Sequence, residues 1–393
     1  MSAVDNTQEP TVSFWNDPKT RSLALQALMI AALLLVGYYL FSNAAFNLAK
    51  LGKTFGYEFL PRTAGFDLSQ TLIEYTSDSS YGRAIIVGFL NTLLIAVLGI
   101  VFATVIGFSV GIMRLSKNWL VAKIAMVYIE TVRNIPLLLQ LIVWYKVVLG
   151  PLPDNKQALN FGNLFYLSKK GLNLPSPVFG AGAWMAIVGL IIGIVGAVVL
   201  RRWATARQMA TGQMFPHLSL GILIVVLSPF AGLLAAGWPM TFDYPVAGTF
   251  GFRGGATVLP EFLAMLVGIS VYTGSFIAEI VRSGIQAVSH GQTEAANALG
   301  VRAGLTTRLV IIPQAMRIII PPLASQYLNL TKNSSLGIAI GYPELVYAGG
   351  TVLNQTGKAI EIVLIWMIVY LSLSLLTSAF MNWFNSRVKL VER

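Results

Sequence analysis

Long uncharged apolar runs dominate this chain and constrain its fold more than any other feature. An α-helix of about 20 apolar residues crosses a bilayer core. Eight candidate spans meet this requirement, and they lie at Ser22–Ala49, Ala84–Met113, Trp119–Leu149, Ala181–Leu200, Leu218–Trp238, Pro260–Ile285, Thr306–Leu330 and Glu361–Phe384. Pro136 interrupts the third span, and Arg317 with the pair Pro321 and Pro322 falls within the seventh. The expected fold is therefore all-α, that of a polytopic integral membrane protein.

The composition agrees with a membrane protein and excludes several classes of function. Of the 393 residues, 55% are hydrophobic and 11% are charged, whereas soluble domains have about 25% charged residues. With no cysteine and only His217 and His290, the chain offers neither a disulfide nor a histidine or thiolate metal site. The basic residues behind the net charge of +11 lie largely in short loops between apolar runs. We therefore expect a lipid bilayer around the chain and no nucleic-acid partner.

The distribution of Lys and Arg predicts the side of the membrane on which each loop lies. Short loops rich in these residues stay in the cytoplasm. One face collects Arg114, Lys117, Lys123, Arg201, Arg202, Arg207, Arg302, Arg308, Arg387, Lys389 and Arg393. The segments 50–82, 151–180 and 239–258 would then face outward. Both termini, including a tail of residues 1–21, are expected in the cytoplasm, and the helix of residues 22–49 is too long for a signal peptide.

A short polar segment between the sixth and seventh spans carries a recognisable spacing. It reads E-A-A, three residues, G, nine residues and then V-I-I-P, and its fixed positions are Glu294, Ala295, Ala296, Gly300 and Pro313. We expect a helix over residues 292–299 with Glu294 in its first turn, where a carboxylate interacts favourably with the helix dipole. Gly300 would let the chain turn away from this helix. An ordinary amphipathic connector is the alternative for an isolated E-A-A triplet.

This spacing resembles the cytoplasmic EAA loop of binding-protein-dependent ABC importer permeases, here residues 286–304. The stretches SFIAEIVRSGIQAVSHGQTEAA from Ser275, VRNIPLLLQL from Val132 and LTKNSSL from Leu330 are similar to the polar amino-acid uptake subfamily. Within a permease domain of residues 84–386, segments 84–150 and 260–386 would form the five-helix core of a type I importer. The helix of residues 22–49 and a hairpin of residues 181–238 would be additions. This enlarged layout is similar to the general L-amino-acid and the glutamate/glutamine/aspartate/asparagine permeases of Gram-negative bacteria.

The resemblance implies half of a translocation pore for polar L-amino acids in the bacterial inner membrane. Its partners would be two copies of an ABC ATPase, a second permease that is a homologous different chain, and a periplasmic amino-acid-binding protein. The helix at Glu294 would dock into a groove on an ATPase subunit. Because the chain has no glycine-rich phosphate-binding loop, we expect it to be no enzyme and to bind no cofactor, with ATP used by the partner chains.

Polar residues within the spans are candidates for a substrate pathway, because a charge at bilayer depth is costly unless it faces protein or water. Glu279 is the first candidate, and Arg282 can pair with it three residues later. The other candidates come from polar breaks and ends of spans, and they are Lys332, Asn333, Ser334, Ser335, Arg133 and Asn91.

Each candidate also has a structural interpretation. Glu279 and Arg282 could form a purely structural ion pair, residues 332–335 could be the polar end of a helix, Arg133 could pair with Glu130, and Asn91 could join helices. In the pathway interpretation, Glu279 and Lys332 bind the ammonium and carboxylate of any α-amino acid. This requires the seventh span to bend at Pro321 and Pro322.

A proton- or sodium-coupled secondary transporter is the alternative function. Glu130, Glu279 and Lys332 would then be the coupling groups. Such a protein needs no ATPase, and the segment around Glu294 would have no purpose in it.

Overall fold

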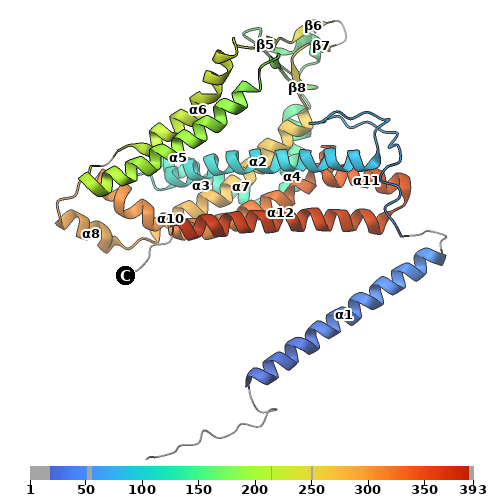
Figure 1. Cartoon of the computed structure of the whole chain (residues 1–393), viewed down its shortest axis with the longest axis horizontal. Helices are drawn as coiled ribbons and strands as arrows, with labels where there is room; N and C mark the ends of the chain where they lie inside the picture. The colour runs from blue at the N-terminus through green and yellow to red at the C-terminus, as the bar shows by residue number, and fades with distance from the viewer. Residues whose placement is uncertain (1–17, 51–54, 214, 249–250, 389–393) are drawn as a thin grey trace, which may run out of the picture.

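The computed structural model describes residues 18–50, 55–213, 215–248 and 251–388 (Figure 1). Helices long and apolar enough to cross a membrane are α1 (Pro18–Lys50), α2 (Tyr81–Arg114), α5 (Met185–Thr211), α6 (His217–Ala235), α7 (Pro260–Gln286), α10 (Ile312–Asn333) with its flanking turns, and α12 (Ala359–Val388). A bent pair, α3 (Trp119–Asn134) and α4 (Leu137–Ile142) with the π-helical η1 (Val143–Leu149), supplies an eighth span. The expected polytopic helical fold is confirmed. Most of the expected tail of residues 1–21 and the last five residues lie outside the described part.

Helices α2 and α7 pack closely along their length, and small residues make this approach possible. A Cβ atom at Gly107 of α2 would lie 2.4 Å from the Ile277 side chain of α7, and one at Gly111 would lie 2.7 Å from the Ala278 carbonyl oxygen. A Cβ at Gly274 of α7 would lie 2.9 Å from the Ile106 side chain. In a bilayer, where lipid is as apolar as the helices, such van der Waals contact is a main source of helix association.

The rest of the core is arranged around this pair. Helix α7 also packs against α10, and α10 against α12 (Figure 1). The 3₁₀ turn η4 (Ser334–Ile340) and the short helix α11 (Leu345–Thr356) follow α10, and α11 rests on α2. At the other end of α10, a short helix α9 (Ala303–Thr306) and the π-helical η3 (Thr307–Ile311) precede it.

The third span is broken at the predicted proline. Its two halves meet at an angle of 105°, and Ile135, the residue before Pro136, has an extended backbone. The carbonyl groups of Val132 and Ile135 both accept hydrogen bonds of 2.8 Å from the buried Nε2 of Gln140. A side chain thus satisfies acceptors that the break exposes, as a low-dielectric environment requires.

Short strands, which we did not expect, organise the predicted outer segments. The strands β1 (Leu159–Phe161), β2 (Phe165–Ser168), β3 (Gly171–Leu174) and β8 (Ala256–Val258) form one antiparallel sheet, preceded by the 3₁₀ turn η2 (Asn155–Gln157). Two further pairs join β4 (Ser176–Phe179) to β5 (Met240–Asp243) and β6 (Val246–Gly248) to β7 (Gly251–Arg253). The β3–β8 and β4–β5 pairings connect the two segments that flank the α5–α6 hairpin.

The two ends of the core differ in structure. The strands gather at one end, whereas α8 (His290–Ala298) and the turn between α5 and α6 lie at the other (Figure 1). The chain reaches β1 at the end of the molecule opposite α8. The elements α3, α4 and η1, which lead to β1, therefore traverse the molecule together as one broken span. Helix α1 stands apart from the core bundle.

The positions of these ends generate a test of orientation. Ala303, in the short helix α9 after α8, and Asn160, in the sheet that contains β8, are both exposed. Helix α8 and the strands lie at opposite ends of the molecule (Figure 1). Single cysteines at these sites should react with an impermeant maleimide from opposite sides of the membrane, Ala303→Cys from the cytoplasm and Asn160→Cys from outside. The chain has no cysteine of its own, so the background is low. Labelling of both positions in the same vesicle orientation would contradict the predicted topology.

Candidate functional site

A small polar cavity lies between α7 and α10. Its volume is about 260 Å³, and its lining residues are Tyr272, Thr273, Phe276, Gln326, Asn329 and Asn333. Amides, a hydroxyl and a phenol supply hydrogen-bond donors and acceptors, while two aromatic rings form apolar walls. This combination suits a small solute that carries both polar and apolar groups.

Only Asn333 among these residues was expected from the sequence. The missed signal is a row of amides on α10, because Gln326, Asn329 and Asn333 follow the spacing i, i+3, i+7 of one helical face. On α7, Thr273 and Phe276 have the same three-residue spacing. The length of the apolar runs located the helices, but the spacing of polar residues along them would have located the cavity.

Arg133 lies next to this cavity through an aromatic contact. Its guanidinium carbon is 5.1 Å from the centroid of the Phe276 ring, which in turn lies 5.0 Å from the ring of Tyr272. The expected ion pair of Arg133 with Glu130 is wrong, since the part of the chain described here contains none between them. The guanidinium instead takes a cation–π position, which remains favourable at low dielectric.

Glu279 and Arg282 form the expected ion pair on α7. The Nε of Arg282 donates to the Glu279 carboxylate at 3.0 Å, and its guanidinium also bonds to Gln286. Glu279 follows Thr273 by six residues, an axial distance of about 9 Å along the helix. The pair therefore lies between the polar cavity and the α8 end of the molecule.

The cluster of residues 332–335 lies at the opposite end of α10. Lys332 is exposed, while the hydroxyl groups of Ser334 and Ser335 donate to backbone carbonyls in the preceding turn at 2.7 and 2.8 Å. Helix α10 is continuous through Pro321 and Pro322, which are both exposed. Within the described residues Glu279 pairs with Arg282, and no ion pair joins it to Lys332. The bend that would bring Lys332 to Glu279 stays a prediction.

Asn91 connects α2 to the segment before α11. Its Nδ2 donates at 2.9 Å to the carbonyls of both Gln70 and Pro343, and the hydroxyl of neighbouring Thr92 accepts from the Leu345 amide at 3.1 Å. These bonds support the helix-joining interpretation of Asn91, which is not among the residues that line the α7–α10 cavity.

Glu344 is a fully buried acid that the sequence analysis did not select. It caps α11 by accepting 2.8 Å hydrogen bonds from the amides of Val346 and Tyr347, and Tyr370 donates to the same carboxylate at 3.2 Å. Burial, only partly opposed by these hydrogen bonds, raises the pKa of Glu344 to about 7. The residue lies outside the candidate membrane spans, between the seventh of them and α12.

The E-A-A segment forms the nine-residue helix α8. The Ser289 hydroxyl caps it by accepting from the Gly291 amide, so the helix starts at His290 and Glu294 lies beyond the first turn. The expected interaction of Glu294 with the helix dipole is therefore wrong. Gly300 adopts a φ of +71° just after the helix, as its predicted turning role requires.

One face of α8 rests on the core and the other is exposed. Ala296 is buried, and Gln314 of α10 donates to the Gln292 side chain at 3.1 Å. Glu294 and Ala295 are exposed, and Leu299 is 82% exposed. Pro313 is the second residue of α10 and follows the π-helical η3 without a break.

The buried acid generates a prediction about pH. An unfolded Glu344 titrates near its ordinary pKa of 4.5 and the folded one near 7, so the folded state binds more protons between these values. The free energy of unfolding should fall as the pH rises from about 5 to about 7, by a few kcal/mol at most. Thermal unfolding in detergent should show this slope in the wild type and in Glu294→Gln, an exposed control. An equal slope in Glu344→Gln would contradict the assignment.

Comparison with known proteins identifies the family. Residues 185–390 match the family described as binding-protein-dependent transport system inner membrane component. The chain is 53% identical to the general L-amino acid transport system permease protein AapQ of Rhizobium johnstonii, over 96% of this chain and 94% of that protein.

Two further relatives also align over almost their whole length. The putative amino-acid ABC transporter permease protein YhdX of Escherichia coli is 46% identical over the whole of both chains. The glutamate/glutamine/aspartate/asparagine transport system permease protein BztB of Rhodobacter capsulatus is 42% identical over 96% of each. The chain therefore belongs to the family of binding-protein-dependent transport system inner membrane components.

Proposed function

We propose that this chain is the permease subunit of an ABC importer for polar L-amino acids and forms half of its pore. The names of its three relatives support an amino-acid substrate, and one of them specifies glutamate, glutamine, aspartate and asparagine. The location would be the bacterial inner membrane, with both termini in the cytoplasm. Two ABC ATPase subunits, a second permease chain and a periplasmic amino-acid-binding protein would complete the transporter.

The exposed face of α8 is the observation that carries this proposal. A short helix held to the core by Ala296 and Gln292, with Glu294 and Leu299 directed outward, provides a surface for another protein. Helix α8 follows α7 after a short turn and precedes α10, the two helices that line the polar cavity. Because α8 is linked along the chain to both of these helices, a movement that an ATPase imposed on α8 would be transmitted to both walls of the cavity. ATP would be bound and hydrolysed by the partner chains alone.

The α7–α10 cavity is the proposed passage for substrate. Its amides at Asn329 and Asn333 can bind the carboxylate and ammonium common to all α-amino acids. Exposed Lys332, one residue from Asn333, would attract the carboxylate, and Arg133 would add positive charge behind Phe276. Glu279, about 9 Å further along α7, would lie on the path toward the cytoplasm.

The secondary-transporter alternative is not retained. It requires Glu130, Glu279 and Lys332 to act as coupling groups, but the Glu279 carboxylate is paired with Arg282 and Lys332 lies at the far end of the cavity. Family membership also gives α8 a purpose that the alternative lacks.

Reversal of charge at Glu294 tests the coupling role. Glu294→Lys would place like charge against a basic groove on the ATPase, and such a mismatch costs several kcal/mol at an interface. ATP-driven uptake in proteoliposomes should fall at least about tenfold, the equivalent of roughly 1.4 kcal/mol. Gln208→Lys, an exposed site on α5 outside the E-A-A loop, is the matched control and should retain uptake. Normal uptake by Glu294→Lys would remove the basis for coupling through α8.

Leucine substitutions test the cavity. Asn329→Leu and Asn333→Leu each remove an amide at nearly constant size, so uptake should fall by about two- to tenfold, as expected for one lost hydrogen bond. The loss should be similar for every amino acid tested, because the main-chain groups of the substrate are recognised. Asn382→Leu, an exposed amide on α12, should have no effect. A loss confined to one class of side chain would show that the cavity reads side chains instead.

A further inference from the structure

The α5–α6 hairpin is closed at its outer end and open at the other. A Cβ at Gly189 would lie 2.3 Å from the Ser228 carbonyl oxygen, and one at Gly232 would lie 2.2 Å from that of Met185. Toward the other end the same two helices pack less tightly, since a Cβ at Gly221 would be in ordinary contact with the Ala197 side chain at 3.5 Å. A crevice of about 550 Å³ runs along this looser end of the hairpin.

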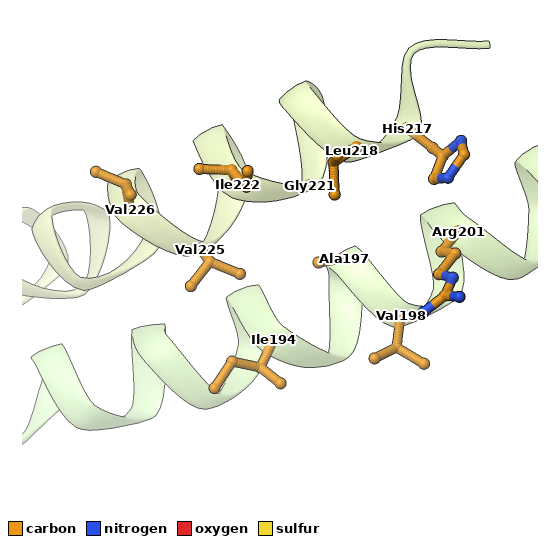
Figure 2. Close-up of a pocket in the computed structure, with 10 residues that line it drawn as sticks. All are labelled: Ile194, Ala197, Val198, Arg201, His217, Leu218, Gly221, Ile222, Val225 and Val226. Atoms are coloured by element: carbon orange, nitrogen blue, oxygen red, sulfur yellow. The ribbon is translucent and has the colours of Figure 1, made fainter. Parts of the chain in front are cut away.

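The walls of this crevice are apolar and its end is cationic. Figure 2 shows Ile194 and Val198 of α5 and Leu218 and Ile222 of α6 along its length. Arg201 and His217, one from each helix, are brought together at one end (Figure 2). A ligand that fills this crevice must therefore combine a long apolar part with a polar or anionic head.

Arg201 lies at the boundary of the membrane-spanning part of α5. The residues from Met185 to Leu200 are uncharged, and Arg201 and Arg202 follow immediately. Arg201 has no ion pair in the part of the chain that the structure describes. Arg207 differs, since its guanidinium lies 5.5 Å from the Trp203 ring centroid and bonds to Gln213. Among the three arginines of this helix, Arg201 is the one that lines the crevice.

The charge of the hairpin selects the kind of head group. No acidic residue occurs between Asp154 and Asp243, so all the formal charges of the hairpin are positive. A zwitterionic lipid would place its own cation beside these arginines, whereas an anionic phosphate would be attracted by each of them. The walls are those of membrane-spanning helices, so the occupant is a component of the bilayer.

We propose that the crevice between α5 and α6 is a binding site for an anionic phospholipid. Its phosphate would accept hydrogen bonds from the Arg201 guanidinium, and an acyl chain would lie along Ile194, Val198 and Ile222. The Nδ1 of His217 lies 3.1 Å from the Phe215 carbonyl oxygen, so its imidazole would lie beside the head group as a polar neighbour. The hairpin makes its extensive helix contacts with itself and not with the core. A bound lipid would fill the gap between its two helices on the cytoplasmic side. This proposal is independent of the transported substrate.

Native mass spectrometry of the full chain with its partner subunits tests the proposal. At the same concentration and under the same conditions, dioleoylphosphatidylglycerol should remain bound to the protein, whereas dioleoylphosphatidylcholine should dissociate. Arg201→Gln should weaken the retained binding about fivefold, the effect of one arginine near a lipid surface. The matched control Arg207→Gln removes equal charge from the same hairpin outside the crevice, and it should change binding less than twofold. The proposal would be overturned if phosphatidylglycerol and phosphatidylcholine were retained equally. It would also be overturned if Arg201→Gln and Arg207→Gln weakened the binding of phosphatidylglycerol by the same factor.

Two further variants separate a bound lipid from other causes. Ala197→Leu keeps both polar residues but fills the crevice, so it should also weaken phosphatidylglycerol binding; unchanged binding would show that the head group attaches at the surface only. A benzophenone attached at Ile222→Cys, in a chain without other cysteines, should cross-link to lipid on illumination of native membranes. A cross-link to a protein chain would show that a subunit covers this face, and the lipid site would be refuted.

Discussion

The close contact of α2 with α7 is the interaction on which the rest of the core depends. Gly107, Gly111 and Gly274 bring these helices so near that even a methyl group at the first two positions would collide with the partner. With one face of α7 fixed against α2, its remaining surface meets α10 and encloses the polar cavity. Helix α8 then follows directly from α7. The position of the proposed coupling surface and that of the proposed passage thus have a common origin.

Interruptions of the helices are stabilised by side chains from other parts of the chain. Gln140 donates hydrogen bonds to two carbonyl groups exposed at the break before α4. At the start of α11, the Glu344 carboxylate accepts from the Val346 amide, and the Thr92 hydroxyl of α2 accepts from the Leu345 amide. Backbone groups left without a partner in an apolar environment cost several kcal/mol each, so these polar contacts are requirements of the fold. They also explain why buried polar residues outside the cavity need not belong to a transport pathway.

The sequence predicted features that depend on local pattern and missed those that depend on tertiary contact. Apolar run length located the spans, and the Glu279–Arg282 pair followed from helical spacing. Arg133 was assigned to Glu130 because the ring of Phe276, distant in sequence, could not be foreseen as its neighbour. The strands of the outer segments were missed for the same reason, since β3 pairs with β8 some eighty residues later. Glu294 was misplaced within its helix because the Ser289 cap begins α8 earlier than the apolar pattern suggests.

Thiol accessibility in the α7–α10 cavity tests the central claim most directly. In the assembled transporter, Asn329→Cys should react with a small hydrophilic thiol reagent, and transported amino acids should slow this reaction in proportion to their occupancy. Asn382→Cys, on the exposed surface of α12, should react at a rate that substrate does not change. Protection of the cavity cysteine alone is the result predicted for a substrate passage between α7 and α10. Equal rates with and without amino acid at both positions would contradict it.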